Sequence, residues 1–137
     1  MPKKLPSIPS LEKKLDDVFS KFIRLRDAGP DGYNKCCTCS KVLHWKEANC
    51  CHFVPRAKRA TRWDETNCYS GCTHCNFYNE LHHYHLGRLI DKLHGEGTAD
   101  QLIRLGHSTF KVDRGFLMQK IDYYKDAVTD MLKIVKI

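Results

Sequence analysis

Two pairs of cysteines constrain this chain more than any other feature. Cys36 and Cys39 form one C-x-x-C pair, and Cys72 and Cys75 form a second, each beside turn-forming residues. Two sulfurs three residues apart on a tight turn can reach one ion from the same side, and a second pair can close a tetrahedron around it. The spacing therefore predicts a structural zinc site. A redox-active pair is the alternative, but that chemistry is typical of a βαβ context, which the sequence does not show.

Four further cysteines, Cys37, Cys50, Cys51 and Cys68, lie outside this ligand set. They stand beside hydrophobic or β-prone residues, where a free thiol usually behaves as a small buried apolar group. We expect that role for them. One alternative stays open, because Cys37 could replace Cys36 as a ligand.

Length and composition fit one intracellular domain. With 137 residues the chain is one domain long, and a domain of this size buries roughly two-thirds of its extended surface. No apolar run approaches the roughly 18 residues that a membrane span needs, and the N-terminal MPKKLPSIPS has no apolar stretch that could act as a secretory signal. The cysteines are then expected to be reduced, which favours metal binding over disulfides.

The charge is strongly positive. Lys and Arg number 23 against 16 Asp and Glu, a formal net charge of +7. A surplus of this size on a small domain suggests a polyanionic partner, with nucleic acid as the first candidate. A simpler interpretation is that the charge only keeps the protein in solution.

The pattern along the chain predicts an α+β fold that is mainly helical. Residues 1–9 hold three prolines and two lysines, which is typical of a flexible basic arm. From an N-cap at Ser10, apolar residues recur at steps of three and four up to Leu25, so an amphipathic helix is expected there.

Strands and further helices are expected after this first helix. Residues 36–55 suit a short β-hairpin, followed by a polar loop to about Gly71. Helices are expected over residues 76–95, 98–105 and 113–132. We assign one domain to residues 10–137, with a core at about 33–95 and a C-terminal helical part at about 98–137.

One histidine and two asparagines are spaced around the cysteines in a way that points to catalysis. His52 ends the expected hairpin, Asn67 lies in the following loop, and Asn76 comes directly after the last cysteine. Phosphodiester hydrolysis needs a base that activates water and a cation that neutralises charge on the phosphate. An imidazole titrates near neutral pH, and an amide oxygen is an acceptable Mg²⁺ ligand. This layout is similar to that of an HNH, or ββα-metal, nuclease, here with a zinc-stapled core flanked by an N-terminal helix and C-terminal helices. Beside two cysteines, His52 could instead be a zinc ligand or a packed core histidine.

The chain resembles the NinG/Rap recombination nucleases of lambdoid and related phages, and more loosely the phage endonuclease VII resolvases. The similarity rests on FIRLRD at 22–27, C-x-x-C at 36–39, CCHFVPR at 50–56, TRWDETNCYSGCTHCN at 61–76 and a helical region through about 132. The combination is specific because two cysteine pairs are interleaved with His and Asn. The resemblance implies a DNA endonuclease that cuts branched recombination intermediates, including Holliday junctions and D-loops, and leaves a 5′ phosphate and a 3′ hydroxyl.

By position, the resemblance implies roles for individual residues. His52 would be the general base, Asn67 would tether the loop and orient this histidine, and Asn76 would bind a catalytic Mg²⁺ or Mn²⁺ ion. One structural Zn²⁺ would be held by Cys36, Cys39, Cys72 and Cys75. The resemblance also implies a phage-encoded protein in the cytoplasm of the bacterial host cell, with phage recombination proteins as its partners.

One position departs from the family's pattern. NinG/Rap nucleases carry Asp three residues before the histidine, where this chain has Asn49. A neutral amide binds Mg²⁺ more weakly than a carboxylate does, so activity is reduced, another carboxylate substitutes, or the position carries an inactivating change. Glu80 is the expected substitute metal ligand, because it lies four residues after Asn76 and would share its helix face. Asp64 and Glu65 are weaker candidates.

Positive charge gathers in the segment between the expected base and the loop asparagine. The DNA-binding candidates there are Arg56, Lys58, Arg59, Arg62 and Trp63. Such side chains contact phosphates and position DNA without reading its sequence; a solvated charge run is the alternative. His83 would share the helix face of Asn76 and contact metal or phosphate, whereas His82 and His85 are expected at the surface or on the DNA backbone.

Cutting two symmetry-related strands needs two active sites, which a two-fold homodimer supplies most simply. Its interface is expected on the N-terminal and C-terminal helices, at Phe19, Phe22, Tyr123, Tyr124 and Val128. Two other functions stay open. One is a zinc-stabilised protein that binds DNA junctions without cutting them, which Asn49 favours. The other is an HNH nuclease that acts on linear duplex DNA.

Overall fold

The structure, a computed structural model, describes residues 4–135 and has the α+β, mainly helical fold that the sequence predicts. Two sheets of two strands each are formed by β1 (Tyr33–Lys35), β2 (Val42–His44), β3 (Asn49–His52) and β4 (Cys68–Gly71). The helices are α1 (Ile8–Arg26), α2 (Arg59–Arg62), α3 (Thr73–Tyr78), α4 (His82–His94), α5 (Thr98–Gly106) and α6 (Arg114–Leu132), and a 3₁₀ turn, η1, spans Glu65–Asn67.

The first helix begins earlier than predicted. Ser7, rather than Ser10, is its N-cap, and the Ser7 hydroxyl accepts a hydrogen bond from the Ser10 N–H at 3.2 Å. Pro9 fits the first turn because the N–H that proline lacks would have no partner there. Residues 8 and 9 of the expected basic arm are therefore helical, and residues 1–3 lie outside the described part of the chain.

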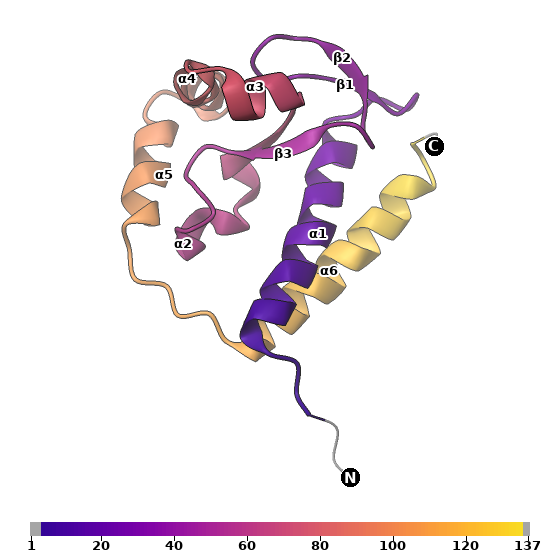
Figure 1. The fold of residues 1–137 in the computed structure, drawn as a ribbon, viewed down its shortest axis with the longest axis vertical. Helices are drawn as coiled ribbons and strands as arrows, with labels where there is room; N and C mark the ends of the chain where they lie inside the picture. The colour runs from indigo at the N-terminus through magenta and orange to yellow at the C-terminus, as the bar shows by residue number, and fades with distance from the viewer. Residues whose placement is uncertain (1–3, 136–137) are drawn as a thin grey trace.

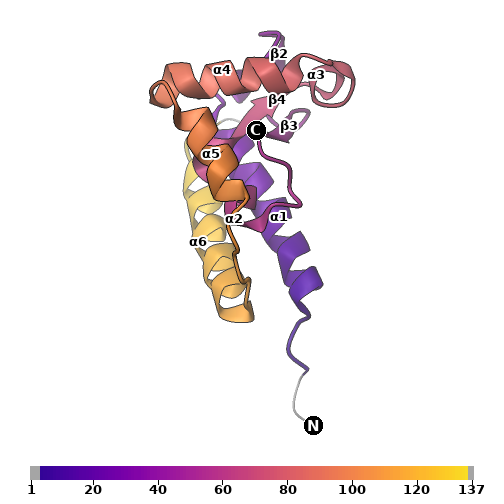
Figure 2. The ribbon, with the colours of Figure 1, turned by 90° about the vertical axis from the view of Figure 1, so that its left-hand side faces the viewer.

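Helices α1 and α6 lie side by side along one side of the molecule (Figures 1 and 2). The ring centroid of Tyr124 on α6 lies 5.1 Å from that of Phe19 and 4.9 Å from that of Phe22, both on α1. These three residues and Val128 are buried within one chain, so they are not available at a dimer interface as expected. The physical reason is that α6 itself covers the apolar face of α1. Tyr123 alone of the five is exposed.

The strands pair differently from the expected hairpin over 36–55. β1 pairs with β2 around the turn that holds the first cysteine pair, and β3 pairs antiparallel with the distant β4. In that second ladder Asn49 lies opposite Gly71, and His52 lies opposite Cys68. The expected polar loop therefore ends in a fully buried strand. The predicted hairpin is wrong because Cys36 and Cys39 lie in the turn between β1 and β2, so that β1 comes before residue 36.

The helix expected over residues 76–95 is two helices. α3 ends at Tyr78, Asn79 turns to an extended conformation with ψ 108°, and α4 starts at His82. The Asn79 side chain stabilises this break by accepting a hydrogen bond from the Leu81 N–H at 3.0 Å. Gly95 ends α4 with φ 110°, as its left-handed preference predicts. In Figure 2, α4 lies crosswise above α1 and α6.

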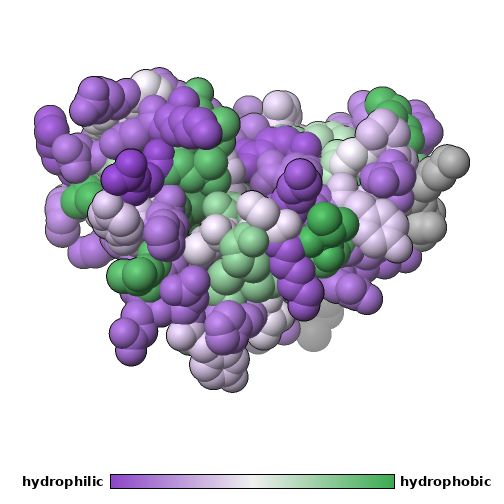
Figure 3. Space-filling model, turned by 90° about the horizontal axis from the view of Figure 1, so that it is seen from above, coloured by the Kyte–Doolittle hydropathy of each residue, from purple (hydrophilic) through white to green (hydrophobic). Residues whose placement is uncertain are grey.

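The last two helices begin close to where the sequence places them. α5 starts at Thr98, and the Asp113 carboxylate caps α6 by accepting a hydrogen bond from the Phe116 N–H at 2.8 Å. No helix in residues 4–135 is both long and apolar enough to cross a membrane. Seen from above, most of the surface is hydrophilic and is interrupted by apolar patches (Figure 3).

Candidate functional site

The two C-x-x-C pairs meet in the structure. The sulfurs of Cys36, Cys39, Cys72 and Cys75 all lie within 4.8 Å of one another. The first pair comes from the turn between β1 and β2, and the second lies where β4 passes into α3. Four thiolates at this spacing are the ligand set of a closed tetrahedral zinc site, so the residues fit the Zn²⁺ ion that the sequence predicts.

Backbone N–H groups point at two of these sulfurs. The Thr38 N–H points at Cys36 Sγ at 3.5 Å, and the Cys75 N–H points at Cys72 Sγ at 3.4 Å. Burial acts to raise the pKa of Cys36, but hydrogen bonds from surrounding backbone N–H groups outweigh it and lower the pKa to about 7. A thiolate in this position is a better metal ligand than an ordinary thiol.

A cleft of about 580 Å³ lies between α1, β3 and α3, next to the cysteine cluster. Three of the residues singled out from the sequence, Asn49, His52 and Asn76, line it together. The helix α1 adds acidic residues to the same wall, Asp16 and Asp17. The cleft therefore brings an imidazole, two amides and carboxylates to one solvent-accessible space.

His52 is half-buried and is fixed by the backbone of the basic loop. Its Nε2 lies 2.9 Å from the carbonyl oxygen of Arg62. Because a carbonyl only accepts, Nε2 carries the proton and Nδ1 carries the lone pair that a base requires. Burial lowers the pKa of His52, and the nearby charge of Arg56 acts in the same direction.

The same histidine has cysteine neighbours. One ring nitrogen of His52 and the sulfurs of Cys50 and Cys68 lie within 4.8 Å of one another. This arrangement would allow His52 to be a metal ligand instead of a general base. The metal content of a His52 variant distinguishes these two roles.

Asn67 ties down the loop between β3 and β4. It is fully buried, and its side-chain oxygen accepts a hydrogen bond from the Val54 N–H at 2.8 Å. Its amide donates to the carbonyl oxygens of Val54 and Thr61, at 3.0 and 3.1 Å. The direct partner of His52 is the Arg62 carbonyl, so Asn67 can act on the histidine only through the fold of this loop.

Replacing Asn67 with alanine should lower the free energy of unfolding by about 3 kcal/mol or more, because three buried backbone groups would lose their partners. Urea unfolding of the variant beside wild type measures this. Gln101→Ala, at an exposed position on α5, is the matched control and should change the stability by less than about 0.5 kcal/mol. A loss below about 1 kcal/mol for Asn67→Ala would show that water replaces these bonds.

Much of the expected DNA-binding charge is paired inside the protein. Arg59 contacts the buried Glu12 at 2.7 Å, and Arg62 contacts Asp16 at 2.6 Å. Trp63, expected on the DNA side, is a core residue only 7% exposed, and its indole N–H donates to Asp16 at 2.9 Å.

Among the described residues, the positive charges of this segment without a short ion pair are Arg56 and Lys58. The side chain of Arg56 is 63% exposed and lines the cleft, while its closest approach to Asp16 is a long 3.8 Å. Lys58 is exposed at the start of α2. These two side chains are the members of the basic segment that a phosphate can reach without breaking a short internal ion pair.

The carboxylate expected to replace the family's aspartate is not in the cleft lining. Glu80 follows the end of α3, so the helix face that it was expected to share with Asn76 does not exist. Asp64 instead caps η1, and Glu65 accepts a hydrogen bond from Tyr124. Asp17, which no sequence motif indicates, is exposed, lines the cleft and has no hydrogen-bond or ion-pair partner within residues 4–135.

Two histidines of α4 lie differently from what the helix pattern suggested. His83 is exposed and stacks on Phe53 with ring centroids 4.4 Å apart, and it does not line the cleft. His82, expected at the surface, is buried at 9% exposure. Both differences follow from the break between α3 and α4, which resets the phase of the second helix.

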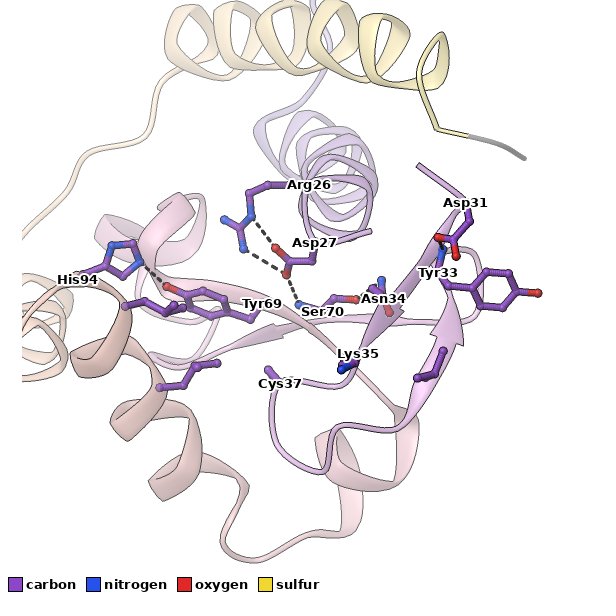
Figure 4. A pocket seen from close by; sticks show the side chains of 13 residues that line it. Arg26, Asp27, Asp31, Tyr33, Asn34, Lys35, Cys37, Tyr69, Ser70 and His94 are labelled. Atoms are coloured by element: carbon purple, nitrogen blue, oxygen red, sulfur yellow. Dashed lines mark hydrogen bonds and ion pairs between the residues drawn. The ribbon is translucent and has the colours of Figure 1, made fainter. Parts of the chain in front are cut away.

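A larger cavity of about 760 Å³ lies elsewhere, beside β1 and β4 (Figure 4). In Figure 4 the Arg26 and Asp27 side chains pair with each other, and the Tyr69 hydroxyl meets His94 at 2.8 Å. None of the residues assigned to catalysis from the sequence lines this cavity. The smaller cleft is therefore the candidate site, since it holds three of the residues singled out from the sequence.

The model of one protein family matches nearly the whole chain. The family is described as bacteriophage lambda NinG protein, and the match covers residues 3–133. The chain belongs to the NinG family. No curated protein and no solved structure matches it. The region matched by the NinG family includes the cysteine cluster, the cleft and helices α1 to α6, so the expected resemblance to this phage family is confirmed.

Proposed function

We propose that this phage-family protein is a metal-dependent endonuclease that cuts branched DNA recombination intermediates, such as Holliday junctions and D-loops. One observation carries the proposal. His52 and Asn76, the two residues on which the enzyme hypothesis depends, line the same cleft together with Asn49.

The local order of elements supports a ββα-metal core. The antiparallel pair β3 and β4 is followed directly by α3, with the histidine on the first strand and Asn76 on the helix. The cysteine cluster fastens the start of α3 to the β1–β2 turn, which fixes the helix beside β3. Histidine and asparagine thus reach one cleft from two rigid elements, as precise chemistry requires.

Each residue of the cleft has a separate role in the proposed reaction. His52 takes a proton from the attacking water, whose oxygen forms a bond to phosphorus while the bond from phosphorus to the 3′ oxygen breaks. The departing 3′ oxygen takes up a proton from solvent water, so the products are a 5′ phosphate and a 3′ hydroxyl. Arg56 contacts a neighbouring phosphate and holds the strand. A Mg²⁺ or Mn²⁺ ion, held by Asn76, Asn49 and Asp17, would supply positive charge at the phosphate.

The ligand set is tested by cleavage of a four-way junction with Mg²⁺ or Mn²⁺. Asn49→Asp should raise the rate, because it supplies the carboxylate of the family's pattern, and the Thr73 hydroxyl, now 2.9 Å from the Asn49 amide, can turn to donate to it. Asp17→Asn should lower the rate about tenfold to a hundredfold, as the loss of a group that supports a metal typically does.

A matched control is Asp122→Asn, which removes an exposed carboxylate on α6 without touching the cleft. Its rate should equal that of wild type. If Asp17→Asn behaves like this control, Asp17 has no part in the site. If neither wild type nor Asn49→Asp cuts any DNA under these conditions, the endonuclease proposal fails.

A junction-binding protein without catalysis is the second candidate, and Asn49 is the observation that favours it. Its amide already donates to Thr73, which is a structural use of the position. Junction binding without cutting would support this candidate, and faster cutting of linear duplex than of junctions would instead support a nuclease of linear DNA. Paired cuts on a junction call for a homodimer. Sedimentation of the protein alone and with junction DNA would detect it.

A further inference from the structure

We propose that a second metal site, separate from the four-cysteine cluster, is formed by Cys37, Cys51 and His82 and takes a thiophilic divalent ion such as Zn²⁺. The two sulfurs and one ring nitrogen of the histidine lie within 4.8 Å of one another. They come from three different elements, the β1–β2 turn, β3 and α4. Thiolates with an imidazole are a usual zinc ligand set.

The histidine of this group is arranged as metal-binding histidines are. His82 is 9% exposed, and its Nδ1 lies 2.6 Å from the Thr38 hydroxyl oxygen. Its Nε2 is buried and has no hydrogen-bond partner among residues 4–135. A buried nitrogen without a partner is costly, whereas coordination would use its lone pair. A hydroxyl on the other ring nitrogen is the support that orients such a ligand.

The two sulfurs converge on a space that glycine keeps open. A β-carbon added to Gly71 would stand 2.6 Å from Cys51 Sγ and 3.4 Å from Cys37 Sγ. No side chain fits between the strand β4 and these sulfurs, so Gly71 allows them to approach each other. Cys36 Sγ lies 3.7 Å from the same point, so the proposed site is a neighbour of the four-cysteine cluster.

The site has a route to solvent. Cys37 is partly exposed and lines the cavity of Figure 4, whereas Cys51 is fully buried. Three protein ligands leave one position of a tetrahedral ion for a water molecule from that cavity. The ion would tie α4 to β3 and to the first cysteine turn.

The group formed by Cys50, His52 and Cys68 lacks these features. His52 Nε2 already has the Arg62 carbonyl as its partner, and among the described residues this group has no buried ring nitrogen without a hydrogen-bond partner. Cys50 therefore provides a matched control, as a cysteine of the same strand outside both proposed ligand sets.

Metal content and spectroscopy test the proposal independently of nuclease activity. The full chain is prepared under reducing, anaerobic conditions and loaded with Zn²⁺ or Co²⁺. Wild type should bind about two ions per chain, one for each ligand set. Cys51→Ala and Cys37→Ser should each lose one ion and keep the cobalt absorption of a tetrathiolate site, whereas Cys50→Ser should keep the wild-type count.

Three results would overturn the proposal. The first is one metal ion per wild-type chain, and the second is an unchanged number of ions in both Cys37→Ser and Cys51→Ala. The third is a Cys37–Cys51 disulfide in the purified protein, detected by mass spectrometry without a reductant. Cys37→Ser changes a partly exposed position, so the test holds even where Cys51→Ala folds poorly. A normal metal count with no DNA cleavage would contradict the proposed function alone.

Discussion

Replacing His52 with alanine should reduce the rate of junction cleavage about a hundredfold to ten-thousandfold, which is the usual cost of losing a general base. Binding of the junction should persist, because the exposed Arg56 and Lys58 would still meet the phosphates. Single-turnover cleavage measured beside gel-shift binding separates the two effects. The variant should also keep the wild-type metal content, since the proposed ligand sets do not include His52.

The matched control for this prediction is His83→Ala, which removes an exposed histidine that stacks on Phe53 outside the cleft. Its cleavage rate should stay within a few fold of wild type. An effect of His52→Ala below about tenfold would remove His52 from the role of base. Loss of a metal ion from this variant would instead identify the histidine as a ligand beside Cys50 and Cys68.

Replacing Cys72 with serine should abolish cooperative folding. Cys72 Sγ lies 3.8 Å from Cys39 Sγ and also caps α3. A serine hydroxyl can still cap the helix, so this substitution removes the zinc ligand alone. The binding energy of a structural zinc is folding energy, on the order of 10 kcal/mol, which is comparable to the whole stability of a small domain. The variant should therefore show no sharp thermal transition by circular dichroism and should lose the zinc of this site.

Cys50→Ser serves as the control here too, because it changes a partly buried cysteine outside the cluster. It should melt sharply and retain its zinc. A Cys72→Ser protein that melted sharply near the wild-type temperature with an unchanged zinc content would show that the four-cysteine assignment is wrong.

Local patterns in the sequence were enough to predict the metal centre and much of the secondary structure. A C-x-x-C pair on a turn has few geometries, so the convergence of Cys36, Cys39, Cys72 and Cys75 could be expected from spacing. The apolar stripe of α1 and the caps at Gly95 and Asp113 are also local signals, because helix ends are set by a few adjacent residues.

The acidic wall of the cleft could not be predicted in this way. Asp17 lies on a helix whose apolar stripe indicates only which face is buried. That α1 runs past β3, and so adds a carboxylate beside His52, depends on how α6 covers the rest of α1. The spacing from Asn76 to Glu80 indicated a shared helix face, but the structure has two helices where the pattern predicts one.

The ion pairs of the basic segment could not be predicted from the sequence either. Arg59 and Arg62 look like free DNA contacts in the sequence, yet Glu12 and Asp16, more than forty residues away, neutralise them. The burial of His82 next to Cys37 and Cys51 could not be predicted either, because it depends on the phase of α4 after the break at Asn79.

The sequence by itself determined the mainly helical α+β class, the four cysteines that converge as a candidate zinc site and the family of this protein, because each is encoded in spacings of a few residues. Only the tertiary structure decided that β3 pairs with β4, that Asp17 and not Glu80 faces the cleft, and that a second group of sulfur and nitrogen ligands forms behind Gly71. Those features join segments far apart in the chain, and their positions are set by the packing of buried side chains rather than by any local preference.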